Sequence, residues 1–186
     1  MEINLSWDLF VIVFFTVIIA YSFIVGRNQT LKIIISSYIA ILTADGIGNI
    51  IERYFIGDTA LINVFDFAQN ESSLIILKIL IFVLTIVVIS TRGRFMIDMG
   101  KNGSHTMGLI LSLTYGILSA GLITSTILIY ASGASLVQES SIIMNEAVLQ
   151  MYRESYMVQL MINNYNVWFS LPAVVFVLSS FVGEEA

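Results

Sequence analysis

The chain has 186 residues, of which 58% are hydrophobic and only 11% are charged, and its mean hydropathy is +0.92. Soluble globular chains are about 45–50% apolar and about 25% charged, so this composition excludes a water-soluble domain, which could not cover its surface with polar groups. The net charge is −5 and the basic residues form no continuous patch, so the sequence does not indicate nucleic-acid binding. The lack of cysteine excludes disulfides and thiolate metal sites.

The apolar runs predict an all-α fold: a polytopic integral membrane helical bundle of four to five transmembrane helices with amphipathic interfacial helices. A spanning helix needs roughly 20 mostly apolar residues. We expect one membrane-embedded domain over residues 1–186, and spans at about 7–26, 31–51, 72–91, 107–131 and 166–183.

The first span is uncharged from Leu9 to Gly26, and Trp7 is placed to anchor it at the interface. Glu2 and Asp8 precede the apolar run, whereas a cleavable signal peptide would carry basic residues there. We therefore expect the segment to remain in the mature protein. The second span has only a short apolar core, from Ile33 to Ala44, and can cross only if Asp45 lies inside the helix.

The third span carries one charge, Lys78, and the fourth carries none from Thr106 onwards. Pro172 interrupts the fifth apolar run. Membrane helices tolerate proline, so this segment either crosses or lies in the interface. The acidic stretch 45–73 is expected to follow the membrane surface. In the stretch 138–161, helical spacing of apolar residues predicts an amphipathic helix, lying on the bilayer or packed on its own bundle.

Basic residues set the expected orientation, because short loops rich in Lys and Arg stay in the cytoplasm. Five of the eight basic residues fall in two loops, after the first and third spans. They are Arg27, Lys32, Arg92, Arg94 and Lys101. We therefore predict a multi-pass protein of the plasma membrane with its N-terminus outside and both basic loops in the cytoplasm.

Small residues recur along the fourth span at every fourth position, with one more glycine beside them. They are Gly108, Ser112, Gly116, Ala120 and Thr124, with Gly121 as the addition. Residues four apart share one ridge of a helix, and small side chains there let another backbone approach closely. We interpret the ridge as a helix-packing surface. The alternative is the lining of a pore or substrate path.

Asp45 and Lys78 are the ionisable residues placed well inside predicted spans. Counting inward from Lys32, Asp45 lies about 20 Å deep in a core of about 30 Å, and Lys78 lies about 10 Å in from Glu71 on the opposite side. Because the two depths agree, we predict an intramembrane ion pair. Alternatively, Lys78 extends to the interface along its own stem, and Asp45 marks the outer end of the second span.

The sequence offers no pairing of a nucleophile with a base, and the single histidine, His105, cannot build a metal site alone. We therefore expect no catalytic residues, no metal, no cofactor and no enzymatic activity. The expected partners are the lipid bilayer and either further copies of the chain or a larger membrane complex, and nucleic acid is not expected.

The order of these features resembles the colicin V production protein family. Trp7-Asp8 opens the first span, Val25-Gly26-Arg27 breaks the chain after it, and TYGILSAGL at residues 114–122 lies in the fourth span. In that family an aromatic-Asp start leads to an Arg-Gly loop, and the last main span carries a Gly-rich stretch followed by an amphipathic segment. The similarity runs loosely over residues 7 to about 130.

The chain also departs from that family. Val25 takes the place of the loop arginine, and Ser119 and Ala120 stand where the family has Arg then Gly. The positions carried over, as structural ones, are Gly26, Gly116 and Gly121. The resemblance implies a non-enzymatic protein of the bacterial inner membrane, accessory to toxin production or secretion, or to envelope maintenance. Two alternatives stay open: a small oligomeric channel or transporter subunit, and an accessory subunit of a larger membrane complex.

Overall fold

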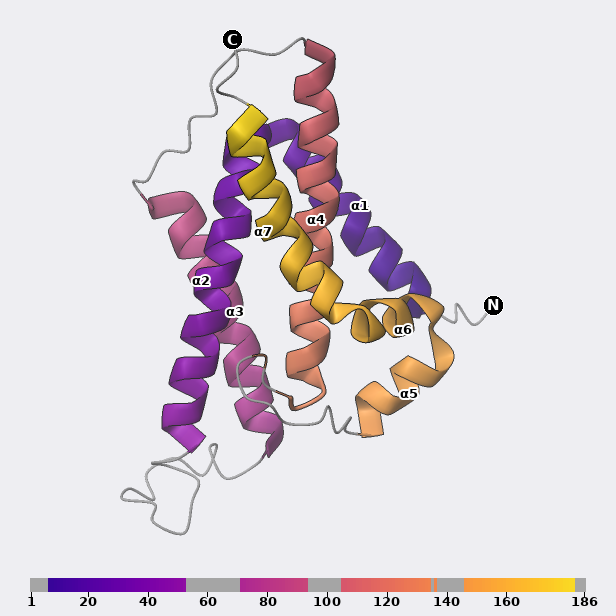
Figure 1. Ribbon diagram of the computed structural model, residues 1–186. Coiled ribbons are helices and arrows are strands. Elements are labelled where there is room, and N and C mark those ends of the chain that lie inside the picture. Colours follow the sequence, from indigo (N-terminus) through magenta and orange to yellow (C-terminus); the bar gives the residue numbers. More distant parts are fainter. Residues whose placement is uncertain (1–6, 53–70, 94–104, 135, 137–145, 183–186) are drawn as a thin grey trace.

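The structure, a computed structural model, describes residues 7–52, 71–93, 105–134, 136 and 146–182, and these form helices without a strand (Figure 1). This confirms the predicted all-α fold. The helices are α1 (Trp7–Val25), α2 (Arg27–Ile51), α3 (Glu71–Arg92), α4 (His105–Ala131), α5 (Glu146–Glu154), α6 (Tyr156–Asn163) and α7 (Tyr165–Val182). The acidic stretch expected along the membrane surface falls largely at 53–70, outside the described residues.

Four helices, α1 to α4, are long and apolar enough to cross a membrane, and the bent pair α6–α7 makes a fifth if it counts as one span. The helix bounds follow the predicted spans closely. The main difference is α2, which begins at Arg27 rather than near residue 31 and continues to Ile51 with Asp45 inside it.

Gly26 alone joins α1 to α2. Its φ of 80° combined with a ψ of 172° is a conformation that glycine adopts without a steric penalty and that residues with a Cβ essentially do not adopt. Its N–H donates to the carbonyl of Ser22 at 3.0 Å, and its own carbonyl accepts from the N–H of Thr30 at 3.1 Å. Because one residue makes the whole connection, α2 starts earlier than its apolar run suggests.

The central helix of the bundle is α4, which packs against α1, α2 and α7 and also touches α3 and α6 (Figure 1). In an apolar stretch of 18 residues of α4, 61% of the residues are buried, against 11% in the corresponding stretches of α1 and α3. Large apolar side chains on α1 and α3 therefore point outwards. The core between α2, α3 and α4 contains Leu31, Ile34, Ala40, Ile41, Ala44, Phe82, Tyr115, Leu122 and Tyr130.

The α5–α6 segment lies against the outer part of α1, where "outer" means the end of the bundle at which α1 begins and α2 ends. Val148 of α5 is buried in one cluster with Val11 of α1 and with Val158 and Ile162 of α6. Of the two interpretations left open for this stretch, the structure therefore favours packing on its own bundle over burial of the apolar face in the bilayer.

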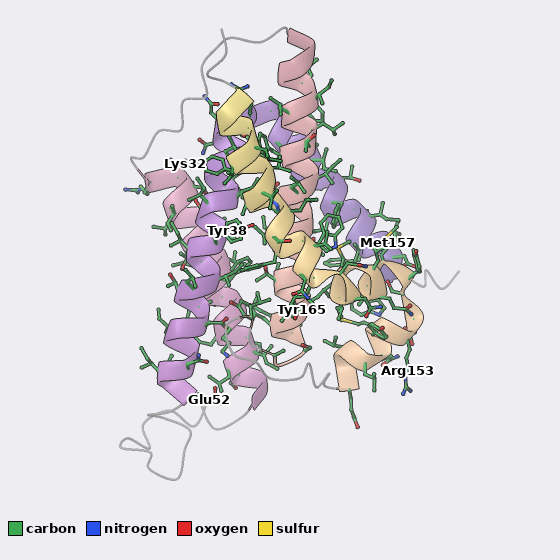
Figure 2. All side chains as sticks on the ribbon, viewed as in Figure 1. Lys32, Tyr38, Glu52, Arg153, Met157 and Tyr165 are labelled. Atoms are coloured by element: carbon green, nitrogen blue, oxygen red, sulfur yellow. The ribbon has the colours of Figure 1, made fainter. Side chains whose placement is uncertain are left out.

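The bend of 62° between α6 and α7 falls at Asn164, not at the proline. Pro172 lies inside α7 and is buried. Proline has no N–H to donate, so it weakens the helix hydrogen bonding around it. Pro172 leaves the carbonyl of Trp168, four residues earlier, without its helix donor. Tyr38 of α2 (Figure 2) donates its hydroxyl to the next carbonyl, that of Phe169, at 2.5 Å and so holds the weakened turn of α7.

Candidate functional site

The small-residue ridge of α4 meets α1 at Ser112 and Gly116. The hydroxyl of Ser112 donates to the carbonyl of Ser22 at 3.4 Å. A Cβ added at Gly116 would lie 3.1 Å from the Cβ of Ser22 and 3.6 Å from the Cα of Ile19. Glycine at this position therefore allows the two helices to approach closely.

Gly121 opens a second gap, toward α7. The indole of Trp168 fills it so closely that a Cβ on Gly121 would fall 2.0 Å from the Cε3 atom of the ring. On its other side, Trp168 meets Phe15 of α1 edge-on, with ring centroids 6.2 Å apart. One aromatic side chain of α7 thus occupies the space between α1 and α4.

The other ridge positions differ among themselves. Ala120 is fully buried, and Thr124 is buried with its hydroxyl bonded to the carbonyl of Ala120 at 2.7 Å. At Gly108 an added Cβ would meet no described atom within 4 Å. The structure therefore brings Ser112, Gly116 and Gly121 into contact with neighbouring helices and leaves Gly108 apart from them.

A polar face of α2 lies near the outer end of that helix. Asp45, Gly48, Asn49 and Glu52 follow one another at the spacings that place residues on one side of a helix. Lys78 of α3 lies across this face, because a Cβ on Gly48 would fall 2.4 Å from the Cε atom of Lys78 and 2.9 Å from its Cγ. Gly48 thus provides the space in which the stem of Lys78 rests.

Asp45 and Lys78 are both buried, with 1% and 8% of their surfaces exposed. The Oδ2 atom of Asp45 accepts the backbone N–H of Leu136 at 3.2 Å, from the segment that follows α4. Nearby, the hydroxyl of Tyr130 donates to the carbonyl of Ile41 at 3.1 Å, one turn before Asp45. The structure places the stem of Lys78 on Gly48, one turn after Asp45 in α2, and the ion pair itself stays a prediction.

Asn49 adds a further buried polar atom on the same side of α2. Its Oδ1 atom is buried and has no hydrogen-bond partner among the residues that the structure describes. We name Asp45, Asn49 and Lys78, together with Gly48, the polar cluster. Ionisable side chains inside membrane segments are costly, and they often mark ion pathways or partners in assembly.

Basic residues gather at the opposite end of α2 and α3. Lys32 donates from Nζ to the carbonyl of Gly93 at 2.5 Å, and Gln29 donates from Nε2 to the carbonyl of Ser90 at 3.0 Å. These contacts satisfy carbonyls at the end of α3, where cations also interact favourably with the helix dipole. The predicted basic loop after the first span is wrong, because Arg27 and Lys32 lie inside α2. Arg92 lies in the last turn of α3, and Arg94 and Lys101 lie outside the described residues.

The contact of Asp8 with α6 was not anticipated from the sequence. Asp8 accepts, at Oδ1, the hydroxyl of Ser155 at 2.6 Å and the backbone N–H of Met157 at 2.9 Å. Ser155 in turn accepts the N–H of Val158 at 3.1 Å as the N-cap of α6. Serine before an apolar helical run is a recognisable cap signal, but nothing in the sequence points to a second capping group 147 residues away.

In the ranges that the structure describes, no group of three or more His, Cys, Asp or Glu side chains is placed to hold a metal ion. Comparison with protein-family models, with curated proteins and with solved structures finds no match to this chain.

Proposed function

We propose that the chain is a non-enzymatic membrane protein similar to the colicin V production family, accessory to toxin production or secretion, or to maintenance of the cell envelope. The bacterial inner membrane, with the N-terminus outside, is the location that fits this proposal and the distribution of basic residues. We expect the protein to act through its shape and its contacts within the membrane.

The observation that carries the proposal is the packing of α4 against its neighbours. Ser22 of α1 and Trp168 of α7 fill the spaces beside its glycines, and its tyrosine hydroxyls form hydrogen bonds to α7 and α2. The outward surfaces of α1 and α3 are apolar. A protein whose inward polar groups hold helices together, and whose outward surface suits lipid, is fitted to a scaffolding role.

The positions that carry the family resemblance also have geometric roles, which supports the proposal. Asp8 caps α6 from the first turn of α1, and Gly26 makes the turn into α2. The stretch 114–122 contains Gly116 and Gly121, the two sites where α4 meets α1 and α7 most closely.

Deletion of the gene in its natural host, followed by measurement of envelope leakage with a membrane-impermeant dye, tests the proposal. We expect dye uptake to rise and to be restored by the wild-type chain. Gly121→Leu should fail to restore it, because Trp168 occupies the space that the new side chain needs. Gly108→Leu is the matched control, since an added Cβ there meets no described atom. An unchanged envelope, and unchanged toxin secretion where a toxin is made, would refute the proposal.

The polar cluster favours a second candidate, a small oligomeric channel or transporter subunit, because Asp45 and Lys78 lie buried at a helix interface. Ion flux into liposomes containing the purified chain separates the two. Flux that disappears in Asp45→Asn would support the channel. Co-purification with other proteins in fixed stoichiometry would instead support an accessory subunit of a larger complex.

A further inference from the structure

In the α5–α6 segment, α5 packs mainly on α6, and α6 packs on α1 and α4. Asp8 caps α6 through Ser155 and the N–H of Met157, and Figure 2 shows Met157 beside the start of α1. The hydroxyl of Ser125 on α4 donates to the carbonyl of Met161 at 3.3 Å. Beneath these bonds, Val148 packs with Val11, Val158 and Ile162.

Asp8 brings the only charge that α1 and α6 contribute to this contact. No other residue of Trp7–Val25 or of Tyr156–Asn163 is an Asp, Glu, Lys or Arg. On α5, Arg153 and Glu154 are exposed, and Glu154 accepts the side-chain amide of Gln150 at 2.9 Å. A carboxylate at the beginning of a helix is stabilised both by the free N–H groups there and by the helix dipole.

We propose that α5–α6 is a strap that opens and closes over the outer part of α1 and α4, and that the carboxylate of Asp8 is the latch that keeps it closed. Asp8 is a positioning residue: it fixes the first turn of α6, and through α6 it holds Val148 and Val158 against Val11. Without the carboxylate, Ser155 loses an acceptor and the N–H of Met157 loses its partner.

The chain contains no cysteine, so single cysteines report directly on exposure. Val148→Cys places a thiol under the strap, where the native side chain is 2% exposed, and Ser119→Cys places one in the middle of α4, where the native side chain is 0% exposed. The experiment measures the rate of maleimide labelling at each thiol in the full chain, in detergent micelles, with and without Asp8→Ala.

We expect Asp8→Ala to raise the labelling rate at residue 148 about five- to tenfold, the change that loss of a helix cap produces in a closed-to-open equilibrium. Asp8→Asn, which keeps the shape and one acceptor, should raise it less. Labelling at residue 119 should stay slow, because α4 remains packed. Glu154→Gln is the matched control: it removes an exposed carboxylate next to Ser155 and should leave both rates unchanged.

Two results would overturn the latch. An unchanged rate at residue 148 in Asp8→Ala would mean that the carboxylate does not hold the strap. Equal acceleration at residues 148 and 119 would mean that Asp8 supports the whole bundle, not a segment that opens by itself.

Discussion

Trp168 of α7 lies on Gly121 of α4 so closely that no larger residue fits between the ring and the helix. The atom that a Cβ would meet belongs to a rigid ring and not to the end of a flexible side chain, and Phe15 of α1 packs on the same ring. The contact joins α1, α4 and α7 at one point, and its contribution to the free energy of unfolding can be measured by substitution.

Gly121→Ala should destabilise the protein by about 1–3 kcal/mol, because the added methyl forces the indole or the whole of α7 to move. Thermal unfolding followed by circular dichroism in detergent gives the difference. Gly108→Ala is the control and should be neutral or stabilising by up to about 1 kcal/mol, since alanine favours a helix more than glycine does. Equal effects of the two substitutions would argue against close packing at Gly121.

Gly116→Ala should cost less than Gly121→Ala. The new Cβ would lie 3.1 Å from the Cβ of Ser22, a distance that a shift of a few tenths of an ångström relieves. Gly116→Leu should separate α1 from α4 and reduce the yield of folded protein in size-exclusion chromatography. A well-folded Gly116→Leu variant would show that α1 is not held by this contact.

Gly26→Ala should destabilise the chain by about 1–3 kcal/mol, because a residue with a Cβ is strained at the φ and ψ of Gly26, a combination that essentially only glycine adopts. There is open space around the position, so the loss would come from backbone conformation alone. Gly26→Asn should be no better tolerated, because a ψ of 172° places Gly26 outside the αL region that asparagine adopts. If either variant melts at the temperature of the wild-type chain, backbone strain at Gly26 does not matter.

Removal of either charge of the polar cluster should impair assembly if Asp45 and Lys78 form the predicted pair. Breaking a buried pair typically costs about 3–5 kcal/mol, because one charge stays buried without compensation. Asp45→Lys and Lys78→Asp should each lower the yield of folded protein, and the two together should restore it. If the double variant is no better than the single ones, the two residues are not paired.

Tyr38→Phe should destabilise the protein by about 1 kcal/mol, through loss of the hydrogen bond to the carbonyl of Phe169. In a Pro172→Ala background the loss should be smaller, because the restored N–H of residue 172 can bond the carbonyl of Trp168 and so stiffen the turn that Tyr38 holds. A double-mutant cycle measures this difference. Additive effects would indicate that Tyr38 and Pro172 act independently.

The helical bundle could be predicted from the sequence, because the length of each uncharged apolar run determines whether it can form a membrane-spanning helix. The positions of α1, α3 and α4 follow from uncharged runs, and the ridge at Ser112 and Gly116 follows from spacing. The start of α2 was missed because the connection is a single glycine, shorter than the loop that the basic residues suggested.

The partners of the ridge could not be predicted in the same way. Trp168 reaches Gly121, and Asp8 reaches Ser155, from helices far away in the sequence. Such contacts depend on how whole helices pack, which periodicity along one helix does not contain. Glycine spacing identifies a surface that accepts a neighbour, but it does not identify the neighbour.

The single residue between α1 and α2 has a consequence for how the protein is made. Two apolar helices tied by Gly26 cannot be far apart at any stage of synthesis, so they are expected to enter the bilayer as one hairpin. On that side they present no loop of their own to proteases or to a binding partner. A protease site or epitope inserted there would have to break the hairpin before it could be recognised.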